Sequence, residues 1–381
     1  DLDLDLYGAG THPFASWTGQ QLTEGHRYEE LINRTQWWGR QMLIWGVHVH
    51  VGLPEQRRVM PVLSALLTYY PHLQALSASS PIWMGVDTGY ASNRALMFQQ
   101  LPTAGLPFQF AHWEEFERFA HDQITTGVID DLSEIRWDLR PAVKHGTLEN
   151  RVCDGVSTLS DMRALVAFRH CLVIWRDERA AAGEELPTMP PWHVQENKWR
   201  SARYGVDAII ILDAASNERL VTDDLAELIP RLAPTAARLG CEAELAEVLQ
   251  IPTRGPSYIR QRAVAELTGD DLVDVMVTEA LRAAEDPEAI QGEIAGLPDV
   301  EVRRVFHRSP GGGRSATSES ICTIRPQRRA RIPGTTRRPS TTGLFTKKSS
   351  CARWSIHDTS VSGASGCGPV ALSTSTSMRM S

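Results

Sequence analysis

Two histidines alternate with valines between residues 45 and 52, a spacing that could serve a metal ion or a phosphate group. In an extended strand successive side chains point to opposite faces, so His48 and His50 share one face and the valines share the other. Imidazole is the commonest side-chain metal ligand. A hydrogen-bonded pair of histidines at a strand end explains the pattern equally well. A zinc hydrolase is a third reading, which neither an HExxH motif nor a third nearby histidine supports.

The segment from residue 137 to residue 154 contains a second candidate group, one carboxylate (Glu149) and two guanidinium groups (Arg140 and Arg151). If residues 147–153 form a strand, Thr147, Glu149 and Arg151 lie on one face, and Arg140 could reach them from across a turn. A carboxylate beside guanidinium groups can hold a divalent cation and the phosphate oxygens that the cation bridges. The simpler alternative is a cross-strand salt bridge, which contributes little to stability.

Polar side chains also follow a helical spacing between residues 196 and 205. On a helix Asn197, Ser201 and Tyr204 fall on one side, while Arg203 shares another side with a glutamate and an arginine. A binding surface and a solvated helix with an i,i+4 ion pair both fit this pattern.

Two loops, residues 8–14 and 87–94, combine small residues with one polar or charged anchor, which is Arg94 in the second loop. Glycine in such loops allows a ligand to approach the backbone closely. The motifs GxxxxGK[ST], GxGxxG and GxSxG do not occur, so a P-loop, a dinucleotide-binding fold and an α/β-hydrolase are not indicated.

Composition excludes several classes of partner. The formal net charge of −7 gives no reason to expect nucleic acid, and no apolar run reaches the length of a membrane span. The six cysteines form no CxxC pair, which fits a cytoplasmic protein better than a disulfide scaffold or a thiolate zinc site. Since the sequence begins at Asp1 rather than Met, it does not decide whether a targeting segment precedes it.

Charge divides the chain in two. Residues 301–381 hold 14 Lys and Arg against 3 Asp and Glu, and residues 1–300 hold 25 against 43. We therefore predict a folded domain over residues 1–300 and a disordered or aberrant tail, rich in Ser, Thr and Arg, over residues 301–381. The tail could bind an acidic partner, but an unrelated or out-of-frame extension is the simpler interpretation.

The folded part mixes strands and helices irregularly, which predicts the α+β class. Residues 161–182 should form a long helix with Arg163, Arg169 and Arg176 on its polar side. The other predicted strands are residues 1–7, 43–51, 134–139 and 147–153, and the other predicted helices are residues 28–41, 60–76 with a break at Pro71, 113–119, 223–239, 242–249 and 270–284.

The order of these motifs closely resembles the glutamate–cysteine ligase type 2 family over roughly residues 6–284. The segments that carry the likeness are GAGTHPF, HRYEELINRTQWWGRQMLIWGVHVHVG, YYPHLQALSASSP, DTGYASNR, IRWDLRP, GTLENRVCDG and ENKWRSARYG. The resemblance implies a glutamine-synthetase-like catalytic fold with packed helices, in which the concave face of an antiparallel sheet binds ATP and a divalent metal.

The resemblance also implies an activity: ATP-dependent ligation of the glutamate γ-carboxylate to an amine such as that of cysteine, through an acyl phosphate. It assigns His48 and Glu149 to Mg²⁺ and Arg140 and Arg151 to catalysis on the phosphoryl group. The remaining matched positions would bind nucleotide or substrate, namely His50, Arg94, Asn197, Arg203 and Tyr204.

Two departures from the family pattern bear on activity. The family begins with a glutamate-rich ExE strand that supplies metal ligands, and nothing before Asp1 provides one, so we expect an N-terminally truncated sheet that lacks its first strand. The family's Ser-Pro-His after the WDxRP motif is here Ala142, Val143 and Lys144, with His145 one position later. A non-catalytic remnant that still binds nucleotide is therefore the alternative function. The sequence is compatible with an oligomer.

Overall fold

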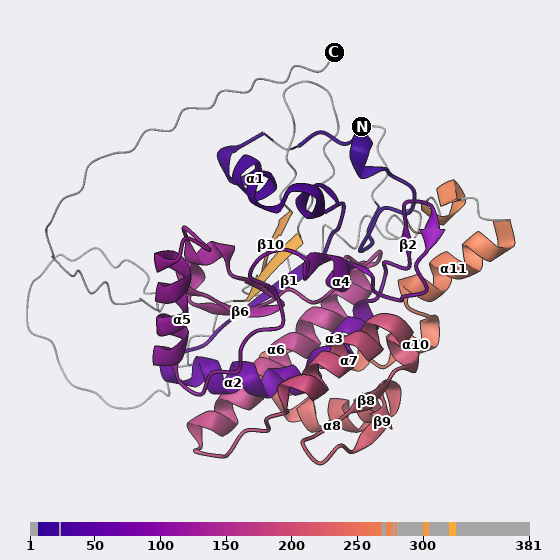
Figure 1. Ribbon diagram of the computed structural model, residues 1–381. Coiled ribbons are helices and arrows are strands. Elements are labelled where there is room, and N and C mark those ends of the chain that lie inside the picture. Colours follow the sequence, from indigo (N-terminus) through magenta and orange to yellow (C-terminus); the bar gives the residue numbers. More distant parts are fainter. Residues whose placement is uncertain are drawn as a thin grey trace, which may run out of the picture.

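The computed structural model describes residues 7–22, 24–268, 272–276, 279, 300–304 and 320–324 (Figure 1). Strands and helices mix along the described chain, which confirms the α+β class. Most of the strand predicted at residues 1–7 and of the helix predicted at 270–284 lies outside the described residues.

A five-stranded sheet carries the histidine pair, in the order β10 (Val300–Arg304), β11 (Ser320–Ile324), β1 (Val47–Gly52), β7 (Thr147–Asn150) and β6 (Leu139–Ala142). β1, β7 and β6 pair antiparallel, as do β10 and β11, but β11 joins β1 in parallel. The sheet is therefore mixed, whereas the resemblance implied an antiparallel one. A free strand edge can pair in either direction, because both satisfy its backbone donors and acceptors.

β10 and β11 lie in the region where the sequence predicted no regular structure. β11 pairs with β1 and so satisfies backbone N–H and C=O groups along that strand. Backbone hydrogen bonding of this kind leaves no pattern in the side chains, so the periodicity of the sequence could not predict these strands. The domain boundary near residue 300 and the character of the rest of residues 301–381 stay predictions.

The β6–β7 hairpin places two of the candidate residues side by side. A 3-10 turn, η5 (Val143–His145), connects the strands, and Gly146 follows it with φ 64°. A residue with a side chain rarely adopts this left-handed conformation, which glycine adopts readily. The turn sets the register that pairs Arg140 with Glu149.

The valine face of β1 rests on the main core. Val47, Val49 and Val51 pack with α2 (Val59–Leu66), α3 (Tyr70–Ser77) and α6 (Leu159–Ala181). Figure 1 shows these helices on one side of β1 and α1 (His26–Arg40) on the other. The break predicted in the helix at 60–76 is confirmed, since η3 (Leu67–Tyr69) separates α2 from α3 and Pro71 stands in the first turn of α3, where no N–H is needed.

α6 begins after Thr158, whose side chain accepts a hydrogen bond from the backbone N–H of Asp161. The prediction that its arginines share a polar side was wrong, because Arg169 and Arg176 are only 1% and 7% exposed. α6 is enclosed by β1, α2, α3, α8 (Val221–Leu239) and α9 (Glu242–Glu247), so it has no wide solvent face.

The other elements complete the frame around the sheet. Helix α7 (Pro191–Tyr204) is joined to the segment between β5 (Arg136–Trp137) and β6 by a buried ion pair in which Lys198 Nζ lies 2.6 Å from Asp138, and Tyr70 donates to the same carboxylate at 3.0 Å. The remaining helices are α4 (Arg94–Phe98), α5 (Trp113–Thr125), α7 (Pro191–Tyr204), α8 (Val221–Leu239), α9 (Glu242–Glu247), α10 (Gln250–Arg254) and α11 (Ser257–Thr268), and the small sheets pair β2 (Ile82–Trp83) with β3 (Val86–Asp87), β4 (Ala104–Gly105) with β5 (Arg136–Trp137), and β8 (Ile209–Ile211) with β9 (Glu218–Leu220).

Candidate active site

Glu149 lies at the centre of a buried polar cluster on the histidine face of the sheet. The strand register places it opposite His50 on β1 and Arg140 on β6. Arg140 Nε and Arg151 Nη1 each donate to one carboxylate oxygen at 2.7 Å. His48 Nδ1 and His50 Nε2 lie 3.4 and 3.6 Å from Oε1. The structure thus brings five of the predicted site residues together.

The charges around Glu149 keep it ionised. Burial by itself would raise the pKa of Glu149, but Arg151 and Arg140, with His48 and His50, hold that pKa well below its usual range. Burial lowers the pKa of His50, and the nearby carboxylate of Glu149 only partly opposes this effect. With neutral histidines the cluster therefore carries one negative and two positive charges.

The orientation of His50 is set by residues from the β6–β7 hairpin. Its Nδ1 lies 2.8 Å from the hydroxyl oxygen of Thr147, which the sequence placed on the same face as Glu149. The ring of His145 stands nearly perpendicular to that of His50, at a centroid distance of 5.6 Å. Lys144 and His145 are both exposed, and His145 is linked to the cluster by its ring contact with His50.

Arg94 supports the cluster by binding the backbone next to Arg151. Its Nη1 donates to the backbone carbonyl of Arg151 at 3.1 Å and lies 3.4 Å from that of Val152. A Cβ at Gly46 would lie 2.1 Å from Arg94 Nη2, so glycine is required there for the guanidinium to fit. The predicted ligand-binding arginine of the second loop therefore holds the backbone that follows β7.

Asp154 joins residues 79–80 to the second of the two loops that the sequence singled out, residues 87–94, a role that sequence reasoning missed. Its carboxylate accepts hydrogen bonds from Ser79 N at 3.1 Å, Ser80 Oγ at 2.6 Å and Ser92 Oγ at 3.0 Å. Burial raises the pKa of Asp154, against the opposing effects of Arg94 and these hydrogen bonds. The only signal for Asp154 in the sequence was its place at the end of the GTLENRVCD segment. Its partners lie more than 60 residues away in the chain, so no local pattern marks them.

The three candidates on α7 lie apart from Glu149 in their described contacts. Asn197 donates to the carbonyl of Ile211 at 2.7 Å and accepts from its N–H at 2.8 Å, which ties α7 to β8. Arg203 donates to the carbonyl of Gly89, and its guanidinium lies 5.1 Å from the ring centre of Tyr204, which is 45% exposed. Their predicted roles toward substrate or nucleotide stay predictions.

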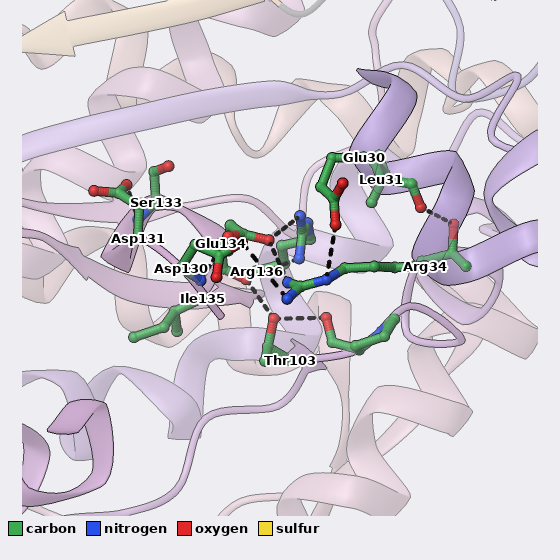
Figure 2. A network of polar contacts seen from close by, with 12 residues as sticks. Glu30, Leu31, Arg34, Thr103, Asp130, Asp131, Ser133, Glu134, Ile135 and Arg136 are labelled. Atoms are coloured by element: carbon green, nitrogen blue, oxygen red, sulfur yellow. Dashed lines mark hydrogen bonds and ion pairs between the residues drawn. The ribbon is translucent and has the colours of Figure 1, made fainter. Parts of the chain in front are cut away.

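A second polar network connects α1 to the turn that binds Arg140, and Figure 2 shows the part of it around Arg34 and Glu134. Arg34 on α1 donates to Glu134 Oε2 at 3.2 Å and to the carbonyls of Val128 and Gly127 at 3.1 and 3.0 Å. From the other side, Arg140 Nη1 donates to the carbonyls of Ser133, at 2.7 Å, and Ile135. The turn η4 (Leu132–Glu134) is thus held between two guanidinium groups. Sequence analysis did not identify this network.

Two further observations concern metal ligands and membrane spans. In the part of the chain that the structure describes, no group of three His, Cys, Asp or Glu side chains is arranged to hold a metal ion by itself. No helix formed by the described residues is long and apolar enough to cross a membrane.

The fold and the cluster define a class: an α+β protein whose sheet presents one ionised carboxylate between guanidinium and imidazole groups, a centre suited to phosphate-bearing ligands. The model of the glutamate–cysteine ligase family 2 matches residues 1–286. The chain belongs to that family, which confirms the resemblance.

Three relatives illustrate the match. A protein of a Nocardioides species with the provisional name glutamate–cysteine ligase 2-3 is 75% identical over 285 residues, which cover 74% of this chain and 76% of the relative. Proteins provisionally named glutamate–cysteine ligase 2 are 65% identical in Mycobacterium ulcerans, covering 72% and 71% of the two chains, and 64% identical in Mycolicibacterium paratuberculosis, covering 73% and 75%.

Proposed function

We propose that this chain catalyses the ATP-dependent joining of the glutamate γ-carboxylate to the amine of cysteine. Family membership supports the reaction, and the names of the relatives supply glutamate and cysteine. The single structural observation that carries the proposal is Glu149 between Arg140 and Arg151, on a sheet that we take to be glutamine-synthetase-like.

The reaction balances in two steps. An oxygen of the γ-carboxylate attacks the γ-phosphorus of ATP, a new O–P bond forms, and the bond to the bridging oxygen breaks to release ADP. The amine nitrogen of cysteine then attacks the acyl carbon, the C–O bond to phosphate breaks, and the nitrogen loses a proton as the amide forms. No protein nucleophile is needed. The protein must bind, orient and stabilise negative charge.

Arg140 and Arg151 are suited to that task. Guanidinium groups bind phosphoryl oxygens in a forked geometry, and here both are fixed beforehand by Glu149. Fixed donors act on developing charge without first having to reorganise, which is the main source of electrostatic catalysis. In this proposal Glu149 orients the two arginines, and they contact the transferred phosphoryl group.

Glu149 is also the residue that would hold Mg²⁺, which when bound with the nucleotide would neutralise phosphate charge. Mg²⁺ commonly takes one or two carboxylates together with phosphate oxygens and water, and each carboxylate oxygen keeps a lone pair beyond its bond to arginine. His48 is a weaker candidate, because imidazole suits zinc or copper better than magnesium.

The other candidates take supporting parts. His50, oriented by Thr147, faces the same cluster and would contact nucleotide or substrate. Arg94 would act indirectly by fixing the backbone of Arg151. Asn197, Arg203 and Tyr204 are proposed to line the substrate side of α7, with Tyr204 the most exposed of them.

The test is ADP release by the purified 381-residue chain with ATP, Mg²⁺ and glutamate, with and without cysteine. Release that requires both amino acids, and formation of the dipeptide by mass spectrometry, would support the proposal. Glu149→Gln should abolish the activity. Glu196→Gln is the matched control, since Glu196 also pairs with an arginine, at 2.9 Å, but on the surface of α7. Nucleotide binding without any release would instead support the alternative, a remnant that does not turn over.

A further inference from the structure

Three guanidinium groups surround one indole in the helical part of the fold. The Cζ atoms of Arg176, Arg179 and Arg231 lie 3.9, 5.0 and 5.3 Å from the ring centre of Trp175. The first two arginines belong to α6, and Arg231 comes from α8. We call these four residues the Trp175 cluster. Because all three cations lie within 5.3 Å of one ring centre, one multiply charged ligand could reach them together.

The central cation of the cluster is incompletely satisfied. Arg176 is 7% exposed, and its Nη2 donates to the hydroxyl of Tyr69. Its Nε and that of Arg179 are both buried and have no hydrogen-bond partner among the described residues. Burial, followed by the charges of Arg179 and Arg231, lowers the pKa of Arg176 to about 10. A buried donor without a partner is costly, and a bound acceptor would remove that cost.

The carboxylates whose charges act on the cluster do not balance it. Cation–π contact with Trp175 offsets part of the repulsion, but one ring cannot neutralise three cations. Of the two carboxylates concerned, Glu184 pairs with Arg179 of the cluster itself, and Asp224 serves cations outside it, at 2.8 Å from His72 and 3.5 Å from Arg219. In the described chain, Arg176 and Arg231 therefore have no carboxylate of their own.

We propose that the Trp175 cluster binds a multiply charged oxyanion, a phosphate or a polycarboxylate, at a site separate from the candidate active site. Guanidinium forks match the oxygen pairs of both anions. Trp175 belongs to the core that covers the valine face of β1, whereas Glu149 lies on the histidine face. Binding at the cluster does not depend on the ligase reaction.

The experiment measures thermal unfolding of the 381-residue protein with inorganic phosphate or citrate, against sodium chloride at equal ionic strength. A ligand that binds only the native state raises the unfolding midpoint, and the chloride series corrects for screening. We expect a saturable rise in at least one anion series. The two series distinguish a phosphate site from a polycarboxylate site.

Three variants test where the anion binds. Arg231→Gln should remove most of the rise while leaving the far-UV circular dichroism spectrum unchanged, because Arg231 is exposed. Arg238→Gln is the matched control on the same helix, since Arg238 already pairs with Glu178 and is 53% exposed. Arg140→Gln should keep the rise, which excludes binding at the candidate active site. A rise no larger than in chloride, or one that Arg231→Gln retains in full, would overturn the proposal.

Discussion

Arg34 and Glu134 join helix α1 to the turn that holds Arg140, with Nη1 and Oε2 3.2 Å apart. Arg140 binds carbonyls of the same turn and also Glu149, so a continuous chain of polar contacts runs from α1 to the centre of the cluster. Glu134 is half-buried, and although burial raises its pKa, the hydrogen bond from the backbone N–H of Asp130 and the charges of Arg136 and Arg34 lower the pKa below its usual value. Figure 2 shows how directly Arg34 reaches this turn.

Replacing Arg34 with Gln should therefore loosen Arg140 without unfolding the protein. We expect kcat to fall by about tenfold, which corresponds to about 1.4 kcal/mol, with a smaller change in KM, because the arginine acts on charge that develops in the transition state. Glu134→Gln should have a similar effect, and the double variant should lose much less than the product of the two. Arg57→Gln removes an 81% exposed arginine paired with Glu55 and serves as the control. Independent, multiplicative losses would show that the two residues do not act together.

Glu149→Gln should reduce turnover by about a hundredfold or more, because Arg140 and Arg151 lose the charge that orients them. The sign of its pH effect follows from the depressed pKa of Glu149. The ionised carboxylate contributes stability that is present above its unfolded-state pKa and is lost as pH falls through the folded-state pKa. Urea titrations at several acidic pH values should show a shallower loss of stability in the variant than in the wild type. Parallel curves would mean that Glu149 titrates alike in both states.

The sequence was sufficient to predict the central cluster because it depends on the two-residue period of strands. That period put His48 with His50 and Glu149 with Arg151, and one hairpin register added Arg140. Family motifs supplied the chemistry, which spacing alone left open between a ligand site and a salt bridge.

The supporting contacts could not be read in the same way, because they join residues far apart in the chain. Arg34 and Glu134 are 100 residues apart, and nothing local marks either as a partner. Arg94 looked like a ligand-binding anchor but binds backbone carbonyls. Arg169 looked solvent-exposed because a charged residue in a helix usually is, and tertiary packing around α6 overrode that rule.

His170 should make stability pH-dependent. Burial lowers the pKa of His170 from 6.5 to about 4, so the folded protein prefers the neutral ring. Its contribution to stability is complete above the unfolded-state pKa and is lost as pH falls from about 6.5 toward 4. His170→Gln should lose less stability than the wild type over that window in urea denaturation. His121→Gln, at an exposed position of α5, is the control and should follow the wild-type curve.

Arg169→Met should stabilise the protein. Arg169 is 1% exposed, and its Nε and Nη2 have no hydrogen-bond partner among the described residues. Burial lowers its pKa to about 9, so at neutral pH the group is still charged and its full desolvation cost opposes folding. Methionine fills a similar volume without a charge. We expect the free energy of unfolding at pH 7 to rise by about 1–4 kcal/mol, the range found when buried charges are replaced by well-packed apolar side chains.

Lys198→Met is the matched comparison, because Lys198 is also fully buried but is paired with Asp138 at 2.6 Å. Removing it leaves the Asp138 carboxylate with Tyr70 as its remaining side-chain donor, so stability should fall by about 3–5 kcal/mol. Urea denaturation of both variants gives the two signs directly. If Arg169→Met destabilised the chain as Lys198→Met does, the guanidinium would have to be compensated by an anion in the folded protein. Comparing the two methionine substitutions therefore shows whether each buried cation has a counter-charge in the folded protein.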